Sequence, residues 1–272
     1  MRRIRSTTTQ KAPRTPRPRR ARRAWCAVGV LTAAAACAGL LLTGGGDAGP
    51  RPLSADEAER LALARFRTYR ISPSEITVRT ASGGGSAVVR AVVDHRRHRA
   101  VGWYEVTGAG RPNGGLVAWD QSGLAVADGS PTAPAEGALR AAGRLKTTAW
   151  TRRAFGTTPL DIALRLALSL GADRPDNAQL LAQSGPLRLR DERVDGRRYD
   201  VFSGPRPRPN ASGSPATTGS RGDRSPLSYW IDDRGSMRRV RVDLGGGRTV
   251  TLDLGGVRVR GGDLPGAPWG ER

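Results

Sequence analysis

Two short groups of polar residues are the ones whose types and spacing could do chemistry. Asp94, His95 and His98 could ligate a metal ion, because carboxylate oxygens and imidazole nitrogens are common metal ligands. Arginines at positions 96, 97 and 99 surround them, and their positive field opposes a bound cation. We therefore interpret this stretch as a solvated turn between two strands and expect no metal site.

Asp232 and Asp233 could serve as a general acid and base. They precede Arg-Gly-Ser in a turn-like stretch, where aspartate is favoured because its carboxylate accepts backbone hydrogen bonds. The glycine runs do not form a phosphate-binding loop, and no serine occupies a G-x-S-x-G motif. The sequence therefore predicts a protein that is not an enzyme and that needs no cofactor.

The N-terminus predicts a single-pass membrane anchor. Residues 1–23 hold ten basic residues and no acidic one, and residues 24–46 carry no charge. The apolar run from 25 to 43 would span about 28 Å as a helix, close to the thickness of a bilayer core. We expect a cytoplasmic basic tail at 1–23, a transmembrane signal anchor at 24–43 and a linker at 44–53. The domain that follows is expected outside the cytoplasm.

Two other interpretations of this segment stay open. A cleaved signal peptide fits the basic start, although the apolar run is long and no clean A-x-A site follows. A lipoprotein would be modified at Cys37, although alanine stands where a lipobox has a branched residue. Both cysteines, Cys26 and Cys37, lie within the apolar run, so the exported part folds without a disulfide.

The charge of the chain has two parts. The 272 residues include 45 Lys+Arg and 24 Asp+Glu, which gives a net charge of +21. Ten of these basic residues belong to the N-terminal tail, so the rest of the chain carries 35 − 24 = +11. A domain outside the membrane does not meet the genome, and no nucleic-acid partner is expected.

Hydrophobic periodicity predicts helices and an antiparallel sheet in the exported part. Ser54 and Glu57 form a capping box before an amphipathic helix that should end before Pro73. Further helices are predicted at about 136–145, at 160–170 after Thr158-Pro159, and shortly after residue 173. About five strands precede these helices and about five follow them, joined by short glycine-bearing turns such as Asp195-Gly196. Residues 205–226 are predicted to form a disordered loop, and 257–272 a tail.

Several stretches resemble a known family. They are ITVRT and SAVVRAVVD after the first helix, NAQLLAQSG, VDGRRYDVFSG, and LSYWIDDRGSMRRVRVDLGGGRTVTLDL. Together they resemble the LolA-like fold of bacterial envelope proteins, in particular the LppX/LprAFG group of actinobacterial lipoproteins. The resemblance covers 54–204 and 227–256. It implies an α+β fold with a curved antiparallel half-barrel, helices on its concave face and a lipid in an apolar cavity.

Two sets of side chains are the candidate binding residues. The apolar concave face is expected to consist of Phe66, Trp103, Leu164, Leu168, Leu181, Tyr229, Ile231, Val240, Val242, Val250 and Leu252. An ordinary hydrophobic core would use the same residues, and the sequence does not separate the two. Arginines of the alternating strands could bind an anionic headgroup, since a guanidinium group matches phosphate oxygens: Arg239, Arg241 and Arg248.

These observations favour a non-enzymatic, membrane-anchored protein that binds a lipid or another hydrophobic ligand in the cell envelope. The expected partners are the membrane, through the anchor, and the lipid ligand. The alternative is an envelope sensor or interaction domain without a lipid cavity, whose partner would be another envelope protein.

Overall fold

The computed structural model describes residues 49–108, 113–129, 135–183, 185–205, 225–261 and 263–269. The chain divides into two compact units, residues 1–46 and 47–272, and everything below concerns the second. The expected basic tail, the signal anchor and nearly all of the expected 205–226 loop lie outside the described residues. Among the residues described, no helix is both long enough and apolar enough to cross a membrane.

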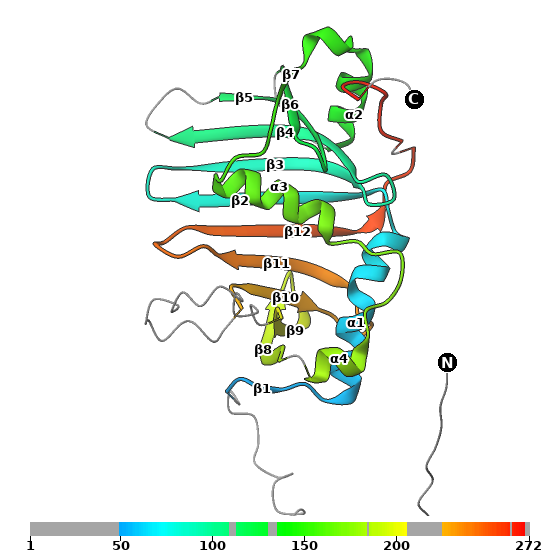
Figure 1. Cartoon of the computed structure of the whole chain (residues 1–272), viewed down its shortest axis with the longest axis vertical. Coiled ribbons are helices and arrows are strands. Elements are labelled where there is room, and N and C mark those ends of the chain that lie inside the picture. Colours follow the sequence, from blue (N-terminus) through cyan, green and yellow to red (C-terminus); the bar gives the residue numbers. More distant parts are fainter. Residues whose placement is uncertain are drawn as a thin grey trace, which may run out of the picture. The chain divides into compact units, whose positions relative to one another are not determined.

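The described strands form one open antiparallel sheet of twelve strands in the order β1-β8-β9-β10-β11-β12-β2-β3-β4-β5-β6-β7 (Figure 1). Their bounds are β1 Arg51–Pro52, β2 Ser74–Ser82, β3 Gly85–Asp94, β4 Arg99–Gly108, β5 Asn113–Asp120, β6 Leu124–Asp128, β7 Thr151–Arg153, β8 Leu187–Val194, β9 Arg197–Ser203, β10 Leu227–Ile231, β11 Met237–Asp243 and β12 Thr249–Arg258.

The sheet consists of two meanders joined at its centre. β2 to β7 follow one another in chain order, and so do β8 to β12. The last strand of the second meander pairs with the first strand of the first, with Leu252 opposite Val78. The predicted α+β class with a long antiparallel sheet is confirmed. The sheet has two more strands than predicted, β1 and β7, and both are very short edge strands.

In the described part of the chain, four helices accompany the sheet: α1 Ala55–Arg70, α2 Ala135–Arg144, α3 Pro159–Ser169 and α4 Ala178–Gln183. A single 3₁₀ turn, Thr147–Ala149, precedes β7. α3 lies across β12, β2 and β3, and α1 packs on α4, β10 and β11 (Figure 1). α2 packs on β3 and β4. Capping explains where two helices begin, because Ser54 and Glu57 form the predicted capping box and Thr158 caps α3 with Pro159 in its first turn.

The two faces of the sheet carry separate cores. On β3, Ala91 and Val93 pack in the cluster that includes α3, whereas Val92 between them packs in the cluster that includes α2. We call these the α3 face and the α2 face. The sheet is therefore covered on both sides around β3 to β5. All of these clusters lie within the second unit, so residues 47–272 contain a core of their own and are expected to fold without the first unit.

The C-terminal segment differs from the predicted tail. The Val259 amide donates a hydrogen bond to the Pro73 carbonyl oxygen at 2.9 Å, and the Val259 side chain is buried. Leu264, Ala267 and Trp269 then pack against the α2 cluster. The tail prediction was wrong for these residues. The high glycine and proline content of 255–268 is typical of an irregular segment, but the few apolar side chains in it complete the core of the α2 face.

The β8–β9 hairpin forms as its sequence predicts. Val194 pairs with Arg197, which leaves Asp195 and Gly196 as a two-residue turn. Their φ angles are 52° and 76°, the left-handed conformations that a type I′ turn needs. Asp-Gly is favoured there because both residues tolerate positive φ.

Candidate functional site

An apolar cavity of about 480 Å³ lies on the α3 face, between α1, the end of α3, α4 and β10. Its walls are mainly hydrocarbon, contributed by Leu61, Leu166, Leu181, Leu227, Tyr229 and Met237. Its volume falls within the range of about 300–1,000 Å³ that is common for small-molecule sites. This cavity is the candidate binding site.

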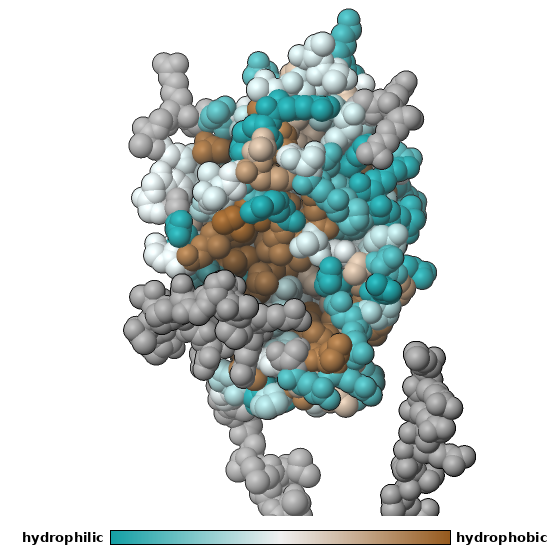
Figure 2. Space-filling model, viewed as in Figure 1, coloured by the Kyte–Doolittle hydropathy of each residue, from teal (hydrophilic) through white to brown (hydrophobic). Residues whose placement is uncertain are grey.

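Apolar side chains gather around this cavity on the surface. Figure 2 shows them in the middle of the α3 face, over β11 and β12 beside α3, and again close to α4. Half-buried apolar residues that pack on the core from this side are Leu160 and Leu166 of α3, Leu227 and Tyr229 of β10, and Leu244. A surface of this kind is typical of a ligand or partner site, because monomeric soluble proteins seldom expose large contiguous apolar patches.

α4 forms one wall of the cavity and is the least buried helix. None of its six residues is buried, and the Leu180 side chain is 61% exposed. The Asn177 side chain caps it by accepting a hydrogen bond from the Leu180 amide at 3.1 Å. α4 packs on α1, and its two leucines, Leu180 and Leu181, line the cavity.

Arg65 is the charged residue that joins the walls of the cavity. Its guanidinium group donates to the Ser169 carbonyl oxygen at 3.1 and 3.2 Å and pairs with the Asp176 carboxylate at 3.3 Å. Backbone hydrogen bonds join the same elements, since the Asp176 amide donates to the Ala62 carbonyl oxygen at 3.0 Å. α1, α3 and the segment before α4 are thereby held together at the cavity.

Tyr229 places a phenol in the cavity wall. Burial raises the pKa of this phenol above its ordinary value, and the carboxylate of Asp176 raises it further, while Arg65 acts in the opposite direction. The Tyr229 hydroxyl is therefore neutral at physiological pH. The described cavity lining contains no histidine or cysteine.

Two of the eleven residues predicted for the apolar face, Leu181 and Tyr229, line the cavity. Seven others lie in the core cluster of the same face, beneath the helices: Leu164, Leu168, Ile231, Val240, Val242, Val250 and Leu252. These seven are at most 5% exposed and form ordinary core rather than cavity wall.

Phe66 and Trp103 lie elsewhere than expected. Trp103 packs with α2 in the core cluster of the opposite face, because β4 is covered on both sides and its apolar residues alternate between two cores. Phe66 is half-buried near the end of α1, with the Arg70 guanidinium 5.7 Å from its ring centroid. The expectation that these two residues join the others on one concave face was wrong.

The three arginines predicted for a headgroup do not line the cavity. Arg239 and Arg241 alternate with Val240 and Val242 on β11, so they point away from α3. The Arg239 Nε lies 2.6 Å from an Asp253 carboxylate oxygen, and Arg248 donates to the Leu244 carbonyl oxygen within its own turn. The basic residue in the described cavity lining is Arg65, which the sequence analysis did not single out because it is one of several arginines of α1 outside the apolar stripe.

The Asp94–His98 turn also differs from the expected solvated turn. Asp94 and His95 are buried, and only the arginines and His98 are exposed. The Ser72 hydroxyl accepts from the His95 amide at 2.7 Å and donates to the Asp94 carboxylate at 3.2 Å. Within the described part of the chain, no group of three or more His, Cys, Asp or Glu could hold a metal ion.

The Asp232-Asp233 pair forms a turn, as its sequence indicates. One Asp232 carboxylate oxygen accepts from the Arg234 and Ser236 amides at 3.0 and 2.7 Å. Both aspartates also line an open hollow of about 670 Å³ beside β9 and α1. Arginines and aspartates line most of that hollow and include the Arg60–Asp200 ion pair at 2.6 Å, so it is a poorer match to an apolar ligand than the cavity.

Comparison with known proteins adds no family to this geometry. No family model matches the chain, and no curated protein matches it either.

Proposed function

We propose that this protein binds a lipid or another hydrophobic ligand without catalysing a reaction on it. In this proposal it is a cell-membrane protein, held by the apolar segment at 24–43, with its folded domain outside the cytoplasm and akin to the LolA-like LppX/LprAFG lipoproteins. The open antiparallel sheet, with α1, α3 and α4 around the cavity on one of its faces, is compatible with that relationship.

The observation that carries the proposal is the apolar cavity of about 480 Å³. An acyl chain that leaves water for such a cavity gains about 0.8 kcal/mol of transfer free energy for each buried methylene. Burial of several methylenes therefore supplies a large part of the binding free energy. Binding of this kind needs no nucleophile and no metal. It needs an apolar wall and an entrance, and α4 with its exposed Leu180 provides both.

The test begins with residues 47–272 purified under native conditions and weighed intact by native mass spectrometry. We expect a bound lipid of defined mass, or uptake of the uncharged dye Nile red by the delipidated protein. Leu181→Asp places a carboxylate in the cavity wall and should weaken dye binding about tenfold or more, since it removes the apolar contact of the leucine with the dye and adds a charge.

Val257→Asp is the matched control for Leu181→Asp. Val257 is apolar and 73% exposed, and it does not line the cavity. Its replacement should leave the dye affinity within twofold. Two results would contradict the proposal and favour an interaction domain. One is a lipid-free mass with no dye binding, and the other is a lipid-free mass with equal dye affinity in both variants.

A further inference from the structure

Arginines and aromatic rings alternate along one edge of the domain, where the end of α1, the β3–β4 turn and the C-terminal segment meet. We call this surface the arginine–aromatic rim: Phe66, Tyr69, Arg70, Arg96, Arg97, His98, Arg99 and Trp269. Three guanidinium groups in it lie over aromatic rings, with distances to the ring centroids of 5.7 Å for Arg70–Phe66, 5.6 Å for Arg96–Tyr69 and 4.9 Å for Arg99–Trp269.

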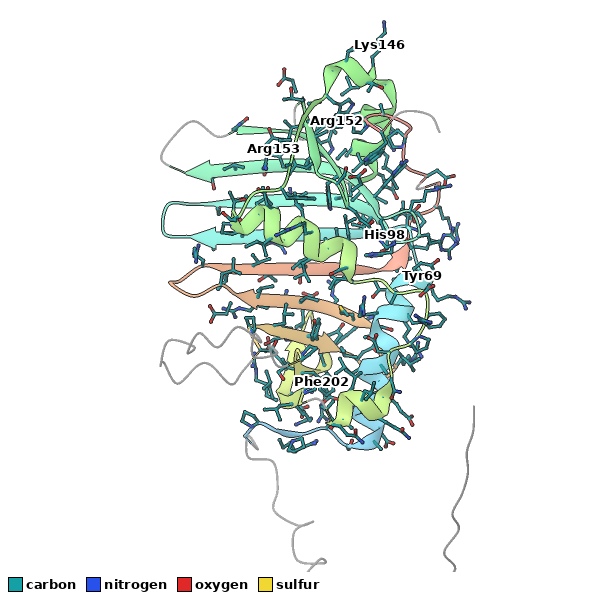
Figure 3. All side chains as sticks on the ribbon, viewed as in Figure 1. Tyr69, His98, Lys146, Arg152, Arg153 and Phe202 are labelled. Atoms are coloured by element: carbon teal, nitrogen blue, oxygen red, sulfur yellow. The ribbon has the colours of Figure 1, made fainter. Side chains whose placement is uncertain are left out.

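The rim is one continuous surface. The Arg96 guanidinium donates to the Arg70 carbonyl oxygen at 3.4 Å, which joins the β3–β4 turn to α1. Arg97 lies 3.4 Å from the carboxylate of Asp263, which joins the same turn to the C-terminal segment. Figure 3 shows Tyr69 and His98 at the same edge of the sheet.

An open hollow of about 540 Å³ lies at the β3–β4 part of the rim, between the β3–β4 and β5–β6 turns. Arg97, His98 and Arg99 line it together with Asp120, Gln121 and Ser122. One carboxylate oxygen of Asp120 is used within its own turn, where it accepts hydrogen bonds from the Ser122 amide at 2.8 Å and from the Ser122 hydroxyl at 2.6 Å. The ion pairs of Arg97 are long, at 3.4 Å to each partner, so its guanidinium is available to another anion.

We propose that the arginine–aromatic rim docks on an anionic membrane surface, with a lipid phosphate in this hollow. Guanidinium groups match phosphate oxygens with paired hydrogen bonds, and basic side chains near an anionic leaflet each add to the attraction. Tyrosine and tryptophan favour the boundary between headgroups and acyl chains. The combination of exposed arginine with half-buried aromatic rings therefore fits a lipid surface better than a fully hydrated polyanion.

This docking surface is separate from the apolar cavity. The hollow and the cavity share no lining residue, and vesicle binding can be measured whether or not the cavity holds a ligand. The rim would hold the domain against the bilayer in addition to any anchor in the chain. A domain held in this way would exchange a hydrophobic ligand with the membrane more readily.

The test measures co-sedimentation of residues 47–272 with vesicles of phosphatidylcholine, alone or with phosphatidylglycerol. We expect at least tenfold tighter binding when phosphatidylglycerol is present, and loss of this preference in high salt. The double variant Arg96→Gln/Arg97→Gln should reduce binding to the anionic vesicles about tenfold or more, because two basic contacts are removed.

Arg193→Gln/Arg197→Gln is the matched control. These two arginines are exposed on the β8–β9 hairpin, far from β3 and β4 in the strand order, and the variant has the same net charge. Its binding should stay within twofold of the wild type. Equal losses in both double variants, or no preference for anionic vesicles, would overturn the proposal.

Inorganic phosphate separates a lipid headgroup from a free-phosphate site. At constant ionic strength, phosphate should compete weakly with the anionic vesicles if a lipid phosphate occupies the hollow. Tight binding of inorganic phosphate without vesicle binding would identify a soluble-ligand site and overturn the docking proposal. Vesicle binding that phosphate does not reduce at all would overturn the assignment of the hollow.

Discussion

Replacing Asp161 by asparagine is expected to lower the free energy of unfolding by about 3 kcal/mol, because it removes a buried carboxylate that accepts three hydrogen bonds, two of them from a cation. The Asp161 side chain is almost fully buried near the start of α3. Its two oxygens accept from the Arg153 guanidinium at 2.7 and 2.9 Å, and one of them also accepts from the Gly156 amide at 2.8 Å. An asparagine cannot accept all of these hydrogen bonds and carries no charge.

The pKa of the Asp161 carboxyl indicates whether burial or the contacts with Arg153 and Gly156 dominate. Burial by itself would raise this pKa, but the hydrogen bonds from Arg153 and Gly156 and the charge of Arg153 outweigh burial and lower it below its ordinary value. The carboxylate therefore stabilises the fold above its unfolded-state pKa, and that stabilisation is lost as the pH falls through the folded-state pKa. The Asp161→Asn variant should lack this part of the acid sensitivity.

Urea unfolding of residues 47–272 at neutral pH measures the effect. Asp173→Asn is the matched control, since Asp173 is exposed in the loop after α3 and its replacement should change stability by less than about 0.5 kcal/mol. Equal stabilities of the two variants would show that Asp161 does not hold α3. Because Leu166 and Leu170 near the far end of α3 line the cavity, a loosened α3 should also weaken ligand binding.

The sequence predicts α3 but does not predict the ion pair between Arg153 and Asp161. Thr158, Pro159 and the leucines after them predict the helix and its N-terminal cap, because capping and periodicity are local. Arg153 belongs to β7, a strand of three exposed residues with no apolar alternation, so nothing in the sequence places it beside Asp161. Contacts between short edge strands and helices depend on tertiary packing.

The candidate site was predictable only in part, for a similar reason. Alternation along β11 correctly separates Val240 and Val242 from Arg239 and Arg241. The pattern does not distinguish a residue beneath a helix from one in a cavity wall, since both are apolar. Most of the predicted set therefore lies in the core, and the wall includes residues of α1 and α4 that only packing brings together.

β4 illustrates a second limit. Its apolar residues fit a strand, but both faces of the sheet are covered there, by α3 on one side and by α2 on the other. Alternation reports which residues share a face and does not say which helix covers that face. Trp103 was assigned to the wrong core because the choice depends on α2, which is separated from β4 by two further strands in the chain.

The stability of the domain is expected to fall by about 3 kcal/mol between pH 6.5 and pH 4, because His95 is buried in its neutral form. Its imidazole is 1% exposed and packs against the backbone at Gly171, where an added Cβ would lie 2.6 Å from the His95 ring. Its Nδ1 lies 3.4 Å from the Leu168 carbonyl oxygen, and since that oxygen only accepts, Nδ1 carries the proton.

Burial lowers the pKa of His95 from 6.5 to about 4, although the Leu168 carbonyl and Asp94 act in the opposite direction. The unfolded chain keeps the ordinary value, so between these two pH values the unfolded state binds the additional proton. Stability therefore decreases as the pH falls from about 6.5 towards 4, and His95 contributes no pH dependence above that window. Carboxylates add their own dependence mainly below about pH 5.

Urea unfolding of residues 47–272 at several pH values from 7.5 to 4.5 tests this assignment. The chain has two histidines, and His98 is exposed in the same turn, so His98→Gln is the matched control and should keep the full slope. His95→Gln should be less stable at neutral pH, because the buried site is filled less well, and its stability should stay level between pH 6.5 and pH 5. If the slope in that range survives in His95→Gln, or disappears in His98→Gln, the buried neutral imidazole is not its source.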